Sequence, residues 1–413
     1  MDVRRVQPER AVGMAARLRH DRFRFRRRSP GRMGRMNDLA AKLRADLAAT
    51  IGGSAGWRRT VEAVPRELFV GDALYRDDAE GWTPICRSEM TRTEWLTLVY
   101  ADTTWVTQVA GVMAEDAAPG PVPIKRPTSS STLPSLVVRM LEASEISEGD
   151  KVLEVGTGTG YSTALMCHRL GASAITSLEC DAVVADRAKT ALTIAGYLPT
   201  LIEGDGLNGH PRNAPYDRLI ATCAVRTIPR AWVEQVRPGG TITTPMLGWT
   251  GGAAFAHLQV AEDGTAAGRF LTHNVYFMPA RPHAAPPLDT VELGVGDVSY
   301  TRVDPSLLND DEALFVAQLA VPQAQHAWAG NVLTLDDPGS GSHADVRPAD
   351  TGRWLVHQHG PVRLWDDAEQ ALTAWLDTGK PHQSAFMLTV TPERQWVSLD
   401  ASGRDNLQWD LPT

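Results

Sequence analysis

Glycines and acidic residues at the ends of predicted strands are the residues of this chain best suited to chemistry. Gly156, Gly158 and Gly160 lie in the stretch VLEVGTGTGY at 152–161. A turn of this composition lets backbone N–H groups approach a nucleotide-like ligand closely. The third glycine of the dinucleotide pattern G-x-G-x-x-G would fall at Tyr161 and is missing, so the turn alone is weak evidence for such a site.

Two carboxylates follow at spacings that suit the same ligand. Glu179 comes 19 residues after Gly160, at the end of AITSLE, where a carboxylate can bind two ribose hydroxyls. Asp205, in LIEGDG, can accept a hydrogen bond from an adenine amino group. A solvated Glu179 at a strand end is the alternative interpretation. The residues expected to bind the ligand are Glu154, Gly156, Thr157, Gly158, Gly160, Tyr161, Glu179, Asp205 and Gly206.

Alternating strand and helix signals position these residues. The apolar run at 152–155 predicts a short buried strand, and residues 161–170 predict the helix that follows it. Further strands are predicted at 174–179 and 216–224, and the turn at 236–244 leads into another. This alternation over 150–245 predicts an α/β fold with a parallel, doubly wound sheet.

The order of these motifs resembles that of the protein L-isoaspartate O-methyltransferases. The motifs are VLEVGTGTGYSTALMC, SLE, GDG, YDRLIATCA and QVRPGGTITTP, with AVPRELFV before them and VYFMP after them. AVPRELFV is similar to the family's VPRxxFV signature, and VYFMP to its closing strand. The resemblance covers residues 57–280. It implies the Rossmann-like fold of class I methyltransferases, S-adenosyl-L-methionine as cofactor and methyl transfer to a peptide carboxylate.

The region expected to receive the substrate departs from the family pattern. The resemblance implies a glycine-rich loop and a Ser-Gln-Pro-like step where this chain has VPIKRPTSSSTLP at 122–134, and it aligns Thr132 with the active-site serine. A flexible loop followed by a helix cap, with Pro134 in the first turn, is the alternative. The side chains expected to hold the carboxylate are Ser129, Ser130, Ser131 and Thr132, and those expected to attract an acidic peptide are Lys125 and Arg126.

Four segments are expected along the chain. They are a basic, disordered segment at 1–36, a methyltransferase domain at 37–280 with an insertion at 85–118, a proline-rich linker at 281–290 and a small α+β accessory domain at 291–413. The last segment holds six of the twelve Trp, so it is expected to be ordered. Within it we expect a strand at 353–357, a helix at 366–379, a hairpin at 385–399 and a mobile loop at 337–343.

The net charge of −8 is unevenly distributed. Residues 1–36 hold 12 Arg and 3 acidic residues, a balance of +9, which leaves 29 basic and 46 acidic residues, or −17, in the remainder. A segment such as RFRFRRR at 22–28 could bind nucleic acid or an acidic surface. We favour a disordered tail or a true start at Met33 or Met36, because a capped helix is predicted to begin at Asn37.

Composition also disfavours several classes of protein. No apolar run approaches the roughly 20 residues of a membrane span, and no signal-peptide core is present, so we expect a cytoplasmic protein without membrane or nucleic-acid partners. The four cysteines lack zinc spacing, and Cys167 and Cys223 are expected to be inert core thiols. His357 and His359 could share one strand face, but we expect no metal.

The domain layout resembles that of dedicated family members from lanthipeptide and graspetide (RiPP) biosynthesis. That resemblance implies methylation of an aspartate in a macrocyclised precursor peptide, which leads to a succinimide or isoaspartate. General repair of isoaspartyl residues in damaged proteins is the main alternative. A non-catalytic peptide-binding module with the same fold is a further one. A methyltransferase for small molecules is disfavoured, because the VPRxxFV signature goes with peptide carboxylates.

Overall fold

The computed structural model describes residues 30–79, 81–122, 126–288, 296–349, 352–400 and 406–412. Two compact units are present, Met1–Leu39 and Ala40–Thr413. Helix α1 (Pro30–Thr50) begins before Asn37, where the sequence predicts its start. Pro30 suits the first turn of a helix, because its fixed backbone angle is already helical there and no N–H is lost. Most of the basic segment, including 22–28, lies outside the described residues.

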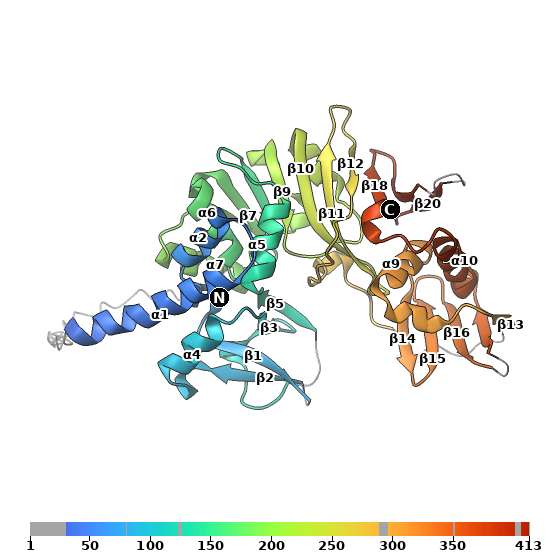
Figure 1. Cartoon of the computed structure of the whole chain (residues 1–413), viewed down its shortest axis with the longest axis horizontal. Helices are drawn as coiled ribbons and strands as arrows, with labels where there is room; N and C mark the ends of the chain where they lie inside the picture. The colour runs from blue at the N-terminus through green and yellow to red at the C-terminus, as the bar shows by residue number, and fades with distance from the viewer. Residues whose placement is uncertain are drawn as a thin grey trace, which may run out of the picture. The chain divides into compact units, whose positions relative to one another are not determined.

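A ten-stranded sheet forms the centre of the second unit (Figure 1). The order of its described strands is β20-β19-β18-β12-β11-β10-β9-β6-β7-β8. From β10 to β8 neighbouring strands are parallel, and from β10 to β20 they are antiparallel. The doubly wound α/β prediction is therefore confirmed. The strands are β6 (Val152–Val155), β7 (Ile175–Glu179), β8 (Thr200–Glu203), β9 (Tyr216–Ala221), β10 (Val236–Leu247), β11 (Ala253–Val260), β12 (Ala266–Arg269), β18 (Phe386–Val390), β19 (Gln395–Leu399) and β20 (Leu407–Asp410).

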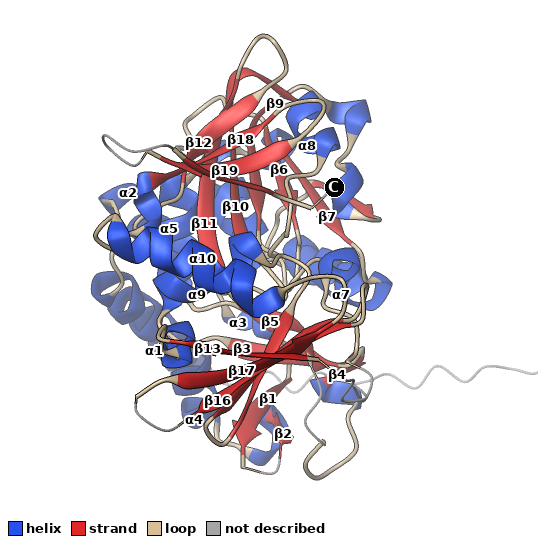
Figure 2. Ribbon diagram, turned by 90° about the vertical axis from the view of Figure 1, so that its right-hand side faces the viewer, coloured by secondary structure: helices blue, strands red, loops and turns tan. Residues whose placement is uncertain are grey.

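Helices flank the parallel part of this sheet (Figure 2). They are α2 (Ala55–Ala63), α3 (Glu67–Val70), α5 (Pro134–Ala143), α6 (Tyr161–Leu170), α7 (Ala182–Ile194) and α8 (Arg230–Gln235). Helix α6 has the predicted bounds and begins directly after Gly160, whose left-handed backbone ends the turn. Asp181 caps α7, since its carboxylate accepts hydrogen bonds from the N–H groups of Val183 and Val184. Helices α6 and α7 thus start just after the ends of β6 and β7.

The predicted insertion belongs to a second, smaller sheet. Its strands are β1 (Ala73–Asp78), β2 (Gly81–Cys86), β3 (Trp105–Val109), β4 (Val112–Met113) and β5 (Pro127–Ser131), and α4 (Arg92–Val99) lies between β2 and β3. The interpretation of the serine-rich run as a flexible loop is wrong, because β5 pairs with β3 from Trp105↔Ser131 to Val109↔Pro127. That pairing fixes the backbone of the run.

The C-terminal residues form a third sheet and also extend the central one. The third sheet contains β13 (Asp297–Thr301), β14 (Gln325–Ala329), β15 (Val332–Asp337), β16 (Ser342–Pro348) and β17 (Trp354–His359), with helices α9 (Asp311–Ala320) and α10 (Leu364–Asp377). The predicted strand, helix and hairpin are all present. The expected mobile loop at 337–343 is a short turn, in which the Asp337 carboxylate accepts a hydrogen bond from the Gly339 N–H at 2.9 Å.

The extension of the central sheet was not expected from the sequence. Strand β18 pairs with β12, from Ala266↔Val390 to Arg269↔Met387. One cluster of buried apolar side chains runs from Leu153 in β6 to Leu411. The division at 281–290 into two domains stays a prediction, because the sheet and the apolar core continue across it. Among the described residues, no helix is long and apolar enough to span a membrane.

Candidate active site

A cavity of about 580 Å³ opens where β6, β7 and β9 end. Its wall includes Val155 to Thr159, Leu178 to Cys180 and Ile220, Thr222 and Cys223, which lie at the carboxyl ends of these parallel strands. Ligands of open α/β sheets bind at this edge, and the volume falls within the range of small-molecule sites. We call this side, with Asp205 and Gly206, the donor wall.

The glycine turn brings the backbone close to the cavity. Gly156 and Gly158 have φ of 98° and 54°, in the left-handed region that glycine occupies without strain. A Cβ on Gly156 would lie 2.6 Å from Oγ1 of Thr222, so a side chain there would force Thr222 aside. A Cβ on Gly158 would lie 3.6 Å from the carbonyl oxygen of Ser130, which places β5 directly beside the turn.

The two predicted ligand-binding carboxylates also reach the cavity. Glu179 accepts hydrogen bonds from the N–H of Gly158 at 2.9 Å and from that of Asp181 at 3.1 Å, and it remains partly exposed. Asp205 accepts from the N–H of Leu207 at 3.0 Å. Both carboxylates keep acceptor capacity, because a carboxylate has about four lone-pair sites. The donor wall can therefore take ligand hydroxyl and amino groups.

Two residues predicted to bind the cofactor do not lie on the cavity wall. Glu154 is fully buried and accepts hydrogen bonds from the hydroxyls of Ser162, Thr163 and Ser177 at 2.5, 2.5 and 2.7 Å. Burial raises the pKa of this carboxyl above its ordinary value. Gly160 does not line the cavity, and a Cβ on it would lie 3.3 Å from Leu192 and 3.4 Å from Ala188 of α7. We infer that both support the turn from behind, since their neighbours belong to β7, α6 and α7.

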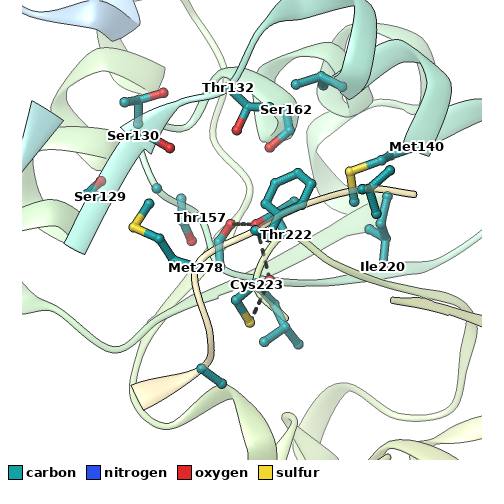
Figure 3. A pocket seen from close by; sticks show the side chains of 18 of the residues that line it. Ser129, Ser130, Thr132, Met140, Thr157, Ser162, Ile220, Thr222, Cys223 and Met278 are labelled. Atoms are coloured by element: carbon teal, nitrogen blue, oxygen red, sulfur yellow. Dashed lines mark hydrogen bonds between the residues drawn. The ribbon is translucent and has the colours of Figure 1, made fainter. Parts of the chain in front are cut away.

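The polar run on β5 and just after it forms a further side of the cavity, which we call the acceptor wall. Ser129, Ser130 and Thr132 line the cavity, and Figure 3 shows them with Thr157 and Met278 around it. The hydroxyls of Ser130 and Thr132 make no hydrogen bond to another described residue, whereas that of Ser129 accepts from Thr107 at 3.2 Å. Ser131 is absent from the wall, and its buried hydroxyl accepts a hydrogen bond from Nη2 of Arg66 at 3.4 Å.

The predicted cationic residues are not placed at the cavity. The Arg126 side chain donates to the carbonyl oxygen of Ala285 at 3.2 Å and does not line the wall. Lys125 lies outside the described residues. Two other arginines line the cavity. One is Arg139 on α5, and the other is Arg281, whose guanidinium is 2.5 Å from the carboxylate of Asp181.

Sequence reasoning missed the segment 274–282 as part of the site. It lines the cavity without forming a regular strand, although its VYFMP stretch was expected to be one. Met140 of α5 and Ile220 add apolar groups on one side of the same cavity, and Met278 adds one near Thr157 (Figure 3). Only the motif order could have indicated segment 274–282, because its side chains carry no polar pattern.

The thiols on the wall are poor nucleophiles. Burial raises the pKa of Cys223 to about 12 and also raises that of Cys180. Both therefore stay protonated at neutral pH. Among the residues that the structure describes, no three His, Cys, Asp or Glu side chains are grouped so as to hold a metal ion. His357 instead has its Nδ1 3.1 Å from the Asp345 carboxylate, and the expectation of a metal-free protein stays a prediction.

The fold and the donor wall define a class I S-adenosyl-L-methionine-dependent methyltransferase. The observations that fit this cofactor are the close backbone at Gly156 and Gly158, the carboxylate of Glu179 after β7, and the apolar side near Ile220. The cofactor would be held by these groups together with Asp205.

The chain belongs to the protein-L-isoaspartate O-methyltransferase family. The model of the family "Protein-L-isoaspartate(D-aspartate) O-methyltransferase (PCMT)" matches residues 88–282. A relative with the name protein-L-isoaspartate O-methyltransferase from Hyperthermus butylicus is 32% identical over 228 residues, which are 52% of this chain and 77% of the relative. One with the same name from Ignicoccus hospitalis is 40% identical over 128 residues, which are 30% of this chain and 60% of the relative.

Several of the sequence matches cover only part of the relative. The chain spans 60%, 54% and 52% of the length of three curated relatives, so about half or slightly more. A solved protein-L-isoaspartate O-methyltransferase is similar over 88% of this chain and 99% of its own, with 19% identity and a TM-score of 0.49.

Proposed function

We propose that this protein methylates an aspartyl or isoaspartyl carboxylate of a peptide, with S-adenosyl-L-methionine as donor. The observation that carries the proposal is the arrangement of the cavity. The hydroxyls of Ser130 and Thr132 line the same cavity as the glycine turn and Glu179. Hydroxyl donors can bind a carboxylate without neutralising it, so the oxygen remains a nucleophile.

The chemistry demands little of the protein's side chains. A carboxylate is ionised near neutral pH and needs no general base. When bound, the cofactor supplies a methyl group activated by the positively charged sulfur. The protein must orient the carboxylate and exclude water, and orientation of this kind can contribute as much as about 7–11 kcal/mol. Ser130 and Thr132 would orient the carboxylate, while segment 274–282 would shield the cavity from water.

The product then changes without further help from the protein. In the methyl ester, the backbone nitrogen of the following residue attacks the ester carbonyl carbon. The ester oxygen leaves as methanol with the proton of that nitrogen, and a succinimide forms. Hydrolysis of the succinimide gives aspartate or isoaspartate.

Two substrate classes fit this chemistry, and we carry both. The first is the aspartate of a macrocyclised ribosomal precursor peptide, favoured by the added C-terminal residues whose strands extend the central sheet. The second is general repair of isoaspartyl residues in damaged proteins. Family membership favours repair at least as strongly, because the curated relatives are named for isoaspartate.

Mass spectrometry with two peptides tests the proposal and separates the two classes. One peptide is linear and contains isoaspartate, and the other contains aspartate within an enzymatically formed macrocycle. Methylation of the macrocyclic peptide alone, followed by loss of methanol, would establish a dedicated aspartate-modifying enzyme. Methylation of the linear peptide alone would establish repair. Cofactor binding without methylation of either peptide would instead indicate a peptide-binding module.

A further inference from the structure

Arg66, in the motif AVPRELFV, is a buried cation without an acidic partner. Its side chain is fully buried, and no ion pair joins it to a described carboxylate. Burial lowers the pKa of its guanidinium to about 10, which leaves it charged at neutral pH. An isolated buried charge is costly unless hydrogen bonds compensate for it. The groups that compensate for this charge indicate what the residue does.

Backbone carbonyl oxygens from two separate segments surround the Arg66 guanidinium. One set belongs to residues 99–104, which begin with the last residue of α4 and which we call the anchor segment. Nη1 donates to the carbonyl oxygens of Val99 and Ala101 at 2.8 Å each, and Nη2 donates to that of Thr103 at 2.9 Å. The other set belongs to the acceptor wall, where Nη2 donates to the carbonyls of Ser131 and Thr132 at 3.3 and 3.2 Å. Arg66 therefore ties the acceptor wall to the anchor segment.

The anchor segment also holds the next residues of the acceptor wall directly. The N–H of Leu133 donates to the hydroxyl of Thr104 at 3.0 Å. The N–H of Ser135, in the first turn of α5, donates to the carboxylate of Asp102 at 2.9 Å. Carbonyl and N–H groups on both sides of Thr132 are thus fixed by one segment.

The direction of these carbonyls matters for an anionic substrate. A carbonyl oxygen that faced the cavity would repel a carboxylate, whereas hydroxyl groups attract it. The carbonyls of Ser131 and Thr132 are turned toward Arg66. Arg66 itself lies behind the wall, since its side chain is fully buried and does not line the cavity.

We propose that Arg66 and the anchor segment are positioning groups for the acceptor carboxylate. By holding the carbonyls of Ser131 and Thr132 away from the cavity, they leave hydroxyl groups as the groups that meet the substrate. This inference rests on the proposed function, because it assigns a role in binding a peptide carboxylate. Arg66 does not touch the substrate, and it acts through the acceptor wall.

The test compares Arg66→Lys and Asp102→Ala with a matched control, Arg218→Lys. Lysine keeps the charge at 66 but cannot span both sets of carbonyls. Asp102 is exposed, so its loss should not prevent folding. Arg218 is a mostly buried arginine paired with Asp150 at 3.0 Å, and it does not line the cavity. The measurements are methylation kinetics with a linear isoaspartyl peptide, calorimetric titration with S-adenosylhomocysteine, and thermal melting.

The expected result is a selective loss on the peptide side. The value of kcat/KM for the peptide should fall about tenfold or more in Arg66→Lys and about threefold in Asp102→Ala, mainly through KM. Affinity for S-adenosylhomocysteine should stay within about twofold, and Arg218→Lys should change only the melting temperature. Unchanged kinetics in a folded Arg66→Lys, or equal loss of S-adenosylhomocysteine affinity, would overturn the inference.

Two further outcomes are also decisive. If Arg66→Lys does not fold, an unchanged kcat/KM in Asp102→Ala overturns the inference, and a reduced value with intact S-adenosylhomocysteine affinity supports it. A wild-type protein that binds S-adenosylhomocysteine but methylates neither the linear nor the macrocyclic peptide overturns both the proposed function and this inference. An active wild type with equally active variants overturns the inference alone.

Discussion

The two walls of the cavity are assembled in different ways. The donor wall comes from adjacent parallel strands, and its key groups, from Gly156 to Glu179, lie close together in the chain. The acceptor wall depends on distant segments: β5 pairs with β3, Arg66 holds it from behind, and segment 274–282 borders the same cavity. Motifs therefore predict the donor wall well, whereas the acceptor wall depends on long-range contacts that short motifs do not encode.

The largest expected effect comes from removing the carboxylate of the donor wall. In Glu179→Ala the affinity for S-adenosylhomocysteine should fall about 10- to 100-fold, because hydrogen bonds to a charged group are worth about 1.5–3 kcal/mol. Glu203→Ala is the matched control, since Glu203 lies opposite Glu179 at the end of β8 and does not line the cavity. Calorimetric titration measures the affinity of both variants for S-adenosylhomocysteine. Equal affinities in the two variants would remove Glu179 from the cofactor site.

A smaller effect is expected from changes in the acceptor wall, and it should fall on the peptide reaction instead of on cofactor affinity. The double variant Ser130→Ala, Thr132→Val should lower kcat/KM for an isoaspartyl peptide about tenfold and leave S-adenosylhomocysteine affinity within about twofold. Thr60→Val is the control, because Thr60 is buried on α2, donates its hydroxyl hydrogen to the carbonyl oxygen of Gly56 and is absent from the cavity wall. Methylation kinetics measure kcat/KM for the peptide, and calorimetric titration measures the affinity for S-adenosylhomocysteine. A loss of cofactor affinity as large as the loss of turnover would assign this run to the donor wall.

The smallest effect is expected at Glu154, which the sequence assigned to the cofactor and the structure places behind the turn. Glu154→Gln should leave S-adenosylhomocysteine affinity within about twofold, because the side chain does not reach the cavity. A tenfold loss of S-adenosylhomocysteine affinity would instead show that Glu154 contributes to cofactor binding.

The same variant should change the pH dependence of stability. Burial raises the pKa of Glu154 in the folded protein above its ordinary value of 4.5. The unfolded state therefore ionises first, and the free energy of unfolding should fall as pH rises between the two pKa values. In Glu154→Gln this decline should be absent. Urea unfolding at several pH values above about 4.5 measures the difference, and parallel profiles for both proteins would contradict it.

The sequence predicted local structure closely and missed long-range pairing. Helix α6 and the hairpin of β18 and β19 lie where periodicity and glycine placed them, because these elements depend on nearby residues. The pairing of β18 with β12 joins segments far apart in the chain, and no local pattern specifies it. The same reason explains why a flexible loop remained an alternative for the serine run: its strand partner, β3, lies in an insertion without a family motif.

The candidate site also divides into residues that local motifs predict and residues that long-range contacts place. Seven of the nine residues predicted for the cofactor line the cavity, and Glu154 and Gly160 do not. On the acceptor side Ser131 faces away, Arg126 bonds to Ala285, and Met278 was missed. The hydrogen bond from Arg66 accounts for the direction of the Ser131 hydroxyl, but it joins distant residues, and the apolar contribution of segment 274–282 has no polar signature in the sequence.

We infer that donor and acceptor groups meet in one cavity. A crystal structure of the protein with S-adenosylhomocysteine and an isoaspartyl peptide tests it most directly. We predict that the ribose hydroxyls donate hydrogen bonds to the carboxylate of Glu179. The peptide carboxylate should accept hydrogen bonds from the hydroxyls of Ser130 and Thr132. A peptide bound away from the acceptor wall, with its carboxylate on other groups, would contradict it.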